Sequence, residues 1–334
     1  MIFGPVLVDA AEGTIPAHSV GLGGRARLRK GRVLDAEDIT RLKDAGIATV
    51  VAAQPEPGDV TENDAAARLA AALVPDAKAA GLTLTEPFTG RVNLLAQGPG
   101  VVVLDAEAVE AANRIHPMIT VATVPPFQQM QTRGMVATIK IISYAVPGDA
   151  LAAACDAAAS AIRMATPVLQ NVRLIVTDTP GGAGLKGVEA IAARVAAFNL
   201  TLPEPVVVPH ETGALARALQ ETTADLVMIL TASATSDPHD TAPEAVRAAG
   251  GQVERFGMPV DPGNLLFIGA ISETSVIGLP GCARAPALNG ADWVLSRLIC
   301  GVPVSAGDIA GMGVGGLLKE IPSRPQPRAG KRAI

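Results

Sequence analysis

The chain has 334 residues, more than one ordinary hydrophobic core accommodates, so we expect two or three domains. It carries 27 basic and 32 acidic residues, and only 2% of its residues are aromatic. A net charge of −5 with few rings for base stacking excludes a nucleic-acid partner from our expectations. Small anions remain possible ligands through local backbone amides.

Neither a disulfide framework nor a membrane segment is expected. The three cysteines, Cys155, Cys282 and Cys300, are far apart and odd in number, which favours packing roles. The N-terminal sequence lacks the basic and apolar regions of a signal peptide, and the apolar runs stop well short of about 18 residues. We expect a cytoplasmic protein.

Residues 1–53 are predicted to form a small β-rich unit, and residues 54–168 an α+β domain. Two stretches share the order Asp-Ala-Glu, helix, β-branched strand, and Asp35 and Asp105 are the expected N-caps of the two helices. Further expected elements are a strand at 3–10, helices at 36–46, 61–80 and 151–165, and strands at 47–53 and 138–147.

From residue 171 onward, strands and helices alternate regularly. Strands are predicted at 172–178, 205–209, 225–231, 253–260, 265–271 and 275–279, and helices at 185–199, 211–222, 241–250 and 283–301. This alternation is typical of a mostly parallel sheet covered by helices, which we assign to a domain at 169–302. We expect a Gly-rich extended segment at 303–320 and a disordered tail at 321–334.

Polar and glycine-rich loops follow the predicted strands of this domain. In an open parallel sheet, ligands bind beyond the carboxyl ends of the strands, so these loops converge on one rim. Hydroxyls, free amides and carboxylates together suit a phosphate-bearing ligand, with a divalent cation as an option. The loop residues in question are Thr177, Asp178, Gly181, Gly182, Ser233, Thr235, Ser236, Asp237, Asp240, Gly278, Pro280 and Gly281.

Several of these features also have structural explanations. Gly182, Gly184 and Gly187 match a dinucleotide fingerprint, but they are separated from the strand and no acidic residue ends the second strand. Thr241 to Glu244 has the pattern of a capping box, which favours a structural role for Glu244. Asp237 and Asp240 suit either caps and turns or ligand contacts. For His239 we favour a solvated side chain in a loop, and for Cys282 a packing role. His18, His116 and His210 form no visible cluster.

The order of these elements, with SDPHDTAPEAVRAAGGQVERFGMPVDPGNLLFIGAI and VIGLPGCARAP, resembles the molybdopterin-binding domain shared by molybdopterin molybdotransferases, molybdopterin adenylyltransferases and gephyrin. The resemblance covers roughly 171–302, and KGRVLDAEDITRLKDAGIATVVAA extends it upstream. The chain departs from the pattern of the molybdotransferases at four places: Asp178-Thr179-Pro180 for Gly-Asp-Glu, Ala232-Ser233 for Gly-Gly, Asn264 for Lys, and Cys282-Ala283 for Asn-Pro.

The resemblance implies a three-layer α/β/α molybdopterin-binding domain with a mostly parallel sheet, preceded by smaller α+β and β-rich domains. It implies that molybdopterin or its nucleotide adduct binds at the rim, held by Thr177, Gly181, Gly182, Ser233, Thr235, Ser236, Pro262, Gly263, Asn264, Gly278, Pro280 and Gly281. Asp178, Asp237 and Asp240 would be catalytic, and Asp237 with Asp240 would hold Mg²⁺.

A transferase of molybdenum cofactor biosynthesis, resembling a molybdotransferase or a nucleotidyltransferase, is therefore the expected function. Its partners would be molybdopterin, molybdate and ATP or CTP, with a separate nucleotidyltransferase or molybdoenzyme and a second copy in a homodimer. The first alternative is a catalytically silent molybdopterin carrier. The second is a nicotinamide-dependent oxidoreductase.

Overall fold

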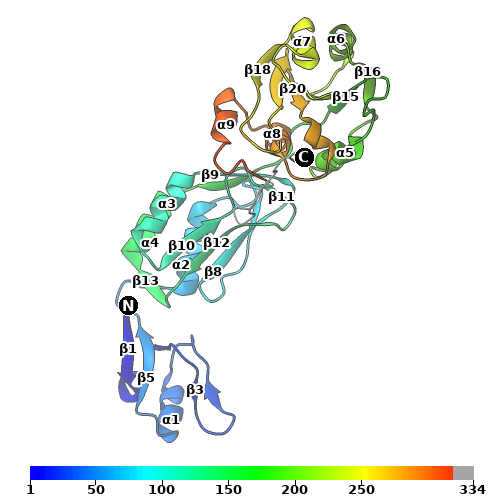
Figure 1. Ribbon diagram of the computed structural model, residues 1–334. Coiled ribbons are helices and arrows are strands. Elements are labelled where there is room, and N and C mark those ends of the chain that lie inside the picture. The colour runs from blue at the N-terminus through cyan, green and yellow to red at the C-terminus, as the bar shows by residue number, and fades with distance from the viewer. Residues whose placement is uncertain (319–334) are drawn as a thin grey trace, which may run out of the picture. The chain divides into compact units, whose positions relative to one another are not determined.

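A computed structural model describes residues 1–318, and its helices and strands are labelled in Figure 1. The contacts between residues divide the chain into two compact units. The predicted boundary near residue 53 lies inside unit 1, and the predicted start of the α/β domain at residue 169 lies close to Ala165, where the main segment of unit 2 begins. The predicted tail, 321–334, lies outside the described residues. Unit 1 comprises Met1–Gly98, Val102–Pro126 and Thr132–Met164, and unit 2 comprises Pro99–Val101, Phe127–Gln131 and the described residues from Ala165 onward.

The first part of unit 1 is a small sheet packed on one helix. The strands pair antiparallel in the order β1-β5-β2, and Leu28, Leu34 and Leu42 are at most 1% exposed in the core between sheet and helix. The elements are β1 (Ile2–Leu7), η1 (Val8–Ala10), β2 (Ile15–Pro16), β3 (Val20–Gly21), β4 (Arg27–Leu28), α1 (Ala36–Asp44) and β5 (Thr49–Gln54).

The rest of unit 1 is built around a four-stranded antiparallel sheet in the order β10-β12-β8-β7, with α2 packed against β8 and β12. As predicted, Asp35 caps α1 and Asp105 caps α3. The elements after β5, up to Ala165, are β6 (Asp59–Thr61), α2 (Glu62–Leu73), β7 (Leu82–Leu84), β8 (Arg91–Ala96), β9 (Gly100–Leu104), α3 (Ala106–Ile115), β10 (Ile119–Thr123), β11 (Gln129–Met130), β12 (Met135–Ile141), β13 (Ala145–Pro147), α4 (Gly148–Ala157) and β14 (Ile162–Ala165).

Unit 2 contains a six-stranded sheet in the order β16-β15-β17-β20-β19-β18. The pairs β15–β16, β15–β17 and β17–β20 are parallel, and the pairs β18–β19 and β19–β20 are antiparallel. The elements are β15 (Val172–Asp178), α5 (Val188–Ala196), β16 (Val206–Pro209), α6 (Thr212–Glu221), β17 (Leu226–Leu230), α7 (Thr241–Ala248), β18 (Gln252–Phe256), β19 (Phe267–Ile271), β20 (Thr274–Leu279), η2 (Gly281–Arg284), α8 (Gly290–Ile299) and α9 (Ala306–Gly311).

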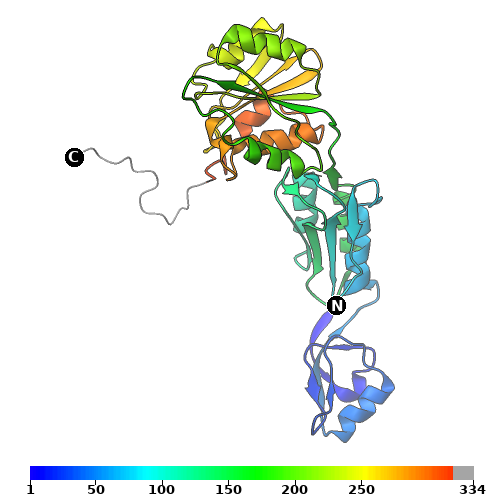
Figure 2. The same ribbon diagram turned by 90° about the vertical axis from the view of Figure 1, so that its right-hand side faces the viewer.

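Helices cover both faces of this sheet, which confirms the predicted three-layer α/β/α architecture (Figure 2). On the face covered by α6 and α7, Leu215 and Val246 pack with Ile229 and Phe267 of the sheet, all four fully buried. The strand residues of β17 are all buried, as expected for a central parallel strand with helices on both sides.

Several predicted elements differ from the structure. The strand expected at 3–10 ends at Leu7 and continues into η1, and the strand expected at 138–147 is divided between β12 and β13. The helix expected at 61–80 ends at Leu73, because Pro75 disfavours helical backbone at Val74. The helix expected at 151–165 ends at Ala157, and its last residues form β14. The helix expected at 283–301 is divided into η2 and α8, and Asn289 forms the capping box of α8. The segment expected to be extended at 303–320 contains α9, capped by Ser305.

Candidate functional site

The candidate site lies where the strand order of unit 2 reverses. The chain passes from β15 to β16 on one side and then returns to β17 on the other side of β15. The loops after β15 and β17 therefore diverge at the carboxyl edge of the sheet, which is the usual ligand position in an open α/β sheet. Because β19 runs antiparallel to β20, with Phe267 opposite Gly278, the loop before β19 lies at this same edge.

A line of three polar side chains occupies this point. Thr177, the fully buried penultimate residue of β15, places its Oγ1 2.8 Å from Nδ1 of His210, and the backbone N–H of Ala232 donates to the same oxygen at 3.0 Å. Nε2 of His210 lies 3.4 Å from Oγ of Ser233, which is exposed. His210, which the sequence left outside any cluster, thus links a buried hydroxyl to a solvent-facing one.

His210 reaches this position because of strand pairing. β16 pairs with β15 in parallel, which sets Pro209 beside Asp178, and the N–H of His210 then donates to the carbonyl of Asp178 at 2.9 Å. The polar residues at the ends of adjacent parallel strands are the sequence signal that could have identified it.

The acidic residues of the loop after β17 accept hydrogen bonds from the backbone of that loop. Asp240 is the N-cap of α7: its Oδ1 accepts from Thr241 N–H at 2.7 Å and its Oδ2 from Ser236 N–H at 3.0 Å. The Ser236 hydrogen bond, followed by that from Thr241 and by nearby His210, keeps the pKa of Asp240 below its usual value despite partial burial. Asp237 Oδ1 accepts from His239 N–H at 2.8 Å.

The predicted capping box at 241–244 is wrong, because the cap lies one residue earlier, at Asp240. Glu244 instead contacts Nδ1 of His239 at 2.8 Å and Nη1 of Arg247 at 2.6 Å, and these two partners lower its pKa, His239 the more strongly. Its role in the structure is an ion pair on an exposed surface.

The loop after β15 folds back over the carboxyl end of that strand. Asp178 Oδ1 accepts from Gly184 N–H at 3.1 Å, and Gly182 N–H donates to the carbonyl of Thr179 at 2.7 Å. A Cβ at Gly182 would lie 2.7 Å from Asp178 Oδ1, so this glycine permits the close turn. Gly181 is exposed, and its amide has no hydrogen-bond partner within the described part of the chain.

Arg284 joins the loops after β15, β17 and β20. From η2, its guanidinium donates to the carbonyls of Gly184 at 3.2 Å, Lys186, and Thr231 at 2.9 Å. Gly187 has a φ of 87°, and a Cβ there would lie 2.5 Å from that of Arg284. The η2 helix and the loop after β15 are therefore packed backbone to backbone.

The other predicted glycine turns are mostly buried. A Cβ at Gly278 would lie 1.9 Å from Cε1 of Phe267, so this glycine makes room for the ring. Pro262 and Gly263 are buried against the start of α8, where Gly290 N–H donates to the carbonyl of Pro262 at 2.8 Å. Pro280 is buried as well. Asn264 and Gly281 are exposed at the rim.

Two sequence predictions remain, the role of Thr235 and the metal site. Oγ1 of buried Thr235 lies 3.4 Å from that of Thr231. Within residues 1–318, no three His, Cys, Asp or Glu residues come together in a way that could hold a metal ion. The magnesium site expected at Asp237 and Asp240 stays a prediction, and we derive no step through Mg²⁺.

Comparisons with known proteins gave one family-model match, to a short N-terminal segment, and matches to solved structures. A family model described as a domain of unknown function (DUF8806) matches residues 5–54. No curated protein matches the chain. Among solved structures, the molybdopterin biosynthesis MoeA protein from Pyrococcus horikosii matches with 15% identity and a TM-score of 0.32, over 93% of this chain and 77% of that one. In residues 1–318, no helix has the length and apolar character needed to cross a membrane.

Proposed function

We propose that this chain binds molybdopterin at the rim of unit 2 and acts in molybdenum cofactor biosynthesis, as a molybdotransferase-like or nucleotidyltransferase-like protein. The motif resemblance supports the ligand. The observation that carries the proposal is the line from Thr177 through His210 to Ser233 at the point where the strand order reverses. Such a position combines directional hydrogen bonds with an accessible edge of the sheet.

The chain's residues divide into binding and positioning roles. The free amide of Gly181, exposed Gly281 and the hydroxyl of Ser233 are available to a phosphate or pterin edge. Thr177 fixes the orientation of the His210 ring, so that Nε2 faces Ser233 and can donate or accept a proton there. Arg284 holds the surrounding loops in place.

A non-catalytic carrier is the second candidate, and the carboxylates favour it. Asp240 uses both oxygens, and Asp178 and Asp237 one each, to accept backbone N–H groups of their own loops. A carboxylate fixed in this way shapes the loop, whereas an acid–base catalyst must reach the reacting group. Nucleotide and molybdate turnover distinguishes the two functions.

The test is anaerobic titration of the full chain with molybdopterin, with and without ATP, CTP or molybdate. We expect binding, and we expect His210→Ala and Ser233→Ala each to weaken it by roughly tenfold, as for the loss of one or two ligand-binding hydrogen bonds. His116→Ala, in unit 1, is the matched control and leaves affinity unchanged. Absence of binding by the unaltered protein would refute the proposal.

Turnover is read in the same samples. Release of pyrophosphate or AMP, or incorporation of molybdate, identifies a transferase and its step. Tight binding without either product identifies a carrier.

A further inference from the structure

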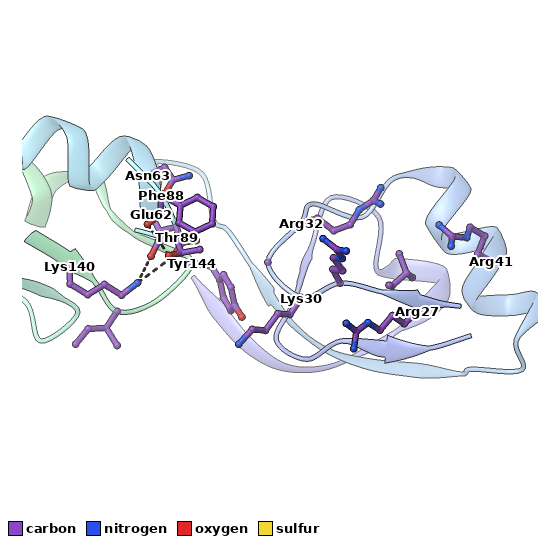
Figure 3. Close-up of a pocket in the computed structure, with 14 residues that line it drawn as sticks. Arg27, Lys30, Arg32, Arg41, Glu62, Asn63, Phe88, Thr89, Lys140 and Tyr144 are labelled. Carbon is purple, nitrogen blue, oxygen red and sulfur yellow. Dashed lines mark hydrogen bonds and ion pairs between the residues drawn. The ribbon is translucent and has the colours of Figure 1, made fainter. Parts of the chain in front are cut away.

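Unit 1 contains a second candidate site, a pocket of about 870 Å³ with strongly basic walls (Figure 3). Six cationic side chains line it, against one carboxylate, Glu62, although the whole chain has a net charge of −5. Such a concentration of one sign of charge in a concave site focuses the field on a ligand of the opposite sign. The six are Arg27, Arg29, Lys30, Arg32, Arg41 and Lys140.

Three of these cations are engaged by the protein. Arg32 lies 2.5 Å and Arg41 3.4 Å from the carboxylate of Asp38, whose side chain is only 2% exposed. Lys140 donates to the carbonyl of Thr89 and lies 3.9 Å from Glu62. These pairs keep part of the wall in place without a ligand.

The other three have no such partner. Within residues 1–318, the side chains of Arg27, Arg29 and Lys30 make no ion pair or hydrogen bond. Arg27 and Arg29 flank Leu28, which is 1% exposed, so the alternation along an extended strand places both arginines on the opposite, exposed face. The local fold thus directs free cations away from the core and into the pocket.

The remaining wall carries two of the chain's few aromatic side chains. Tyr144 donates from its hydroxyl to the carbonyl of Ala17 at 3.3 Å and lies close to Gly31, which connects the two sides of the pocket within unit 1. Phe88 is 75% exposed, although a large apolar ring normally prefers burial. An exposed ring in the same pocket as free cations suits a ligand with a planar or apolar part as well as an anionic part.

We propose that this pocket binds the diphosphate group of a small molecule, either free pyrophosphate or the diphosphate of a nucleotide. Arg27, Arg29 and Lys30 supply charge-assisted hydrogen bonds to the phosphate oxygens, and arginine can do so with two parallel N–H groups. In a nucleotide, the base packs against Phe88. The proposal is independent of pterin binding at the rim of unit 2.

The experiment is calorimetric titration of the full chain with pyrophosphate, ADP and adenosine at low and physiological salt. We expect pyrophosphate and ADP to bind and adenosine alone not to bind. Arg27→Ala and Lys30→Ala each weaken binding by roughly tenfold, and raised salt weakens it further. Phe88→Ala weakens ADP binding but leaves pyrophosphate binding unchanged if the ligand is a nucleotide. If Phe88→Ala reduces the affinities for ADP and pyrophosphate equally, or reduces neither, the ligand is free pyrophosphate.

The matched control is Arg25→Ala. Arg25 precedes Arg27 by two residues and carries the same charge, but it does not line the pocket. Arg25→Ala should retain full affinity. The proposal is overturned if neither pyrophosphate nor ADP binds at millimolar concentration, or if Arg25→Ala reduces affinity as much as Arg27→Ala does.

Discussion

At the scale of single residues, Gly278 shows how a motif glycine can have a packing role. Its position would put a Cβ within 1.9 Å of Cε1 and 2.2 Å of Cδ1 of Phe267, a ring with no exposed surface. We therefore expect Gly278→Ala to lower the free energy of unfolding by about 1–3 kcal/mol through overpacking. Chemical denaturation measures it. Gly281→Ala is the control, since its Cβ meets nothing within 4 Å, and equal stability of the two variants would contradict the packing explanation.

Asp240 gives a pH-dependent prediction. The Ser236 N–H, foremost, with Thr241 and His210, lowers the pKa of its carboxyl from the ordinary 3.8. The folded state therefore favours the ionised form, so the contribution of Asp240 to stability is present above pH 4 and is lost as the pH falls through the lower, folded-state pKa. We expect Asp240→Ala to cost about 1 kcal/mol at pH 7, as for other N-caps, and clearly less at pH 2 to 3.

The measurement compares urea denaturation of the unaltered protein and of Asp240→Ala at pH 7 and at pH 2.5. A difference in unfolding free energy that stays constant between pH 7 and pH 2.5 would show that the charge of Asp240 contributes nothing.

At the scale of elements, two arginines organise the segment after β20. Arg194 of α5 donates to Asp292 of α8 at 2.6 Å and to the carbonyls of Ala283 at 2.9 Å and Ala285 at 2.9 Å. Arg284 connects the same segment to the loops after β15 and β17. The short η2 helix thus depends on side chains from other elements for its position.

Arg284→Ala is expected to release the loop at 179–187. Three carbonyls lose a charged donor, which corresponds to about 2–3 kcal/mol of unfolding free energy, and Arg284→Lys restores only part because lysine lacks the planar fork of donors. Limited proteolysis should show faster cleavage within 179–187. Arg217→Ala, on the exposed side of α6, should change neither stability nor cleavage, and an unchanged loop in Arg284→Ala would contradict the role assigned to Arg284.

The sequence predicted elements well where local pattern decides them. The strand–helix alternation after residue 171 and the caps at Asp35 and Asp105 follow from periodicity and capping chemistry, and the structure confirms them. The strand at Ile162–Ala165 could not be seen, because an alanine-rich run favours helix and the strand forms only by pairing with a distant partner. The contact of His210 with Thr177 likewise depends on the order of strands in the sheet.

At the scale of the whole molecule, unit 2 is not continuous in sequence. It includes Pro99–Val101 and Phe127–Gln131 besides the main segment from Ala165. The guanidinium of Arg297 lies 3.9 Å from the ring centroid of Phe127, and Gln131 donates to the carbonyl of Ala197 at 3.0 Å. A fragment that begins at Ala165 lacks these contacts, although it retains every strand of the six-stranded sheet.

Cys300 reports on the missing segments. In the full chain its side chain is buried, and burial raises the pKa of its thiol to about 11, partly offset by a hydrogen bond with the backbone of Val101. At pH 8 this thiol is protonated and reacts slowly with a disulfide reagent. A fragment of residues 165–318 lacks the segment Pro99–Val101, so we expect the thiol to become more accessible. The loss of burial, which is the larger effect, then lowers its pKa toward the ordinary value of 9.0 and outweighs the loss of the Val101 hydrogen bond, which acts in the opposite direction.

The measurement is the rate of thiol labelling at pH 8 in a Cys282→Ser background, which leaves Cys300 as the one cysteine of the fragment. In the full chain, Cys155→Ser is added for the same reason. We expect labelling at least about tenfold faster in the fragment, because one unit of pKa changes the thiolate fraction by that factor. Circular dichroism establishes that the fragment is folded. Equal rates in a folded fragment would mean that residues 165–318 alone bury Cys300, and that the two short segments contribute nothing to the core of unit 2.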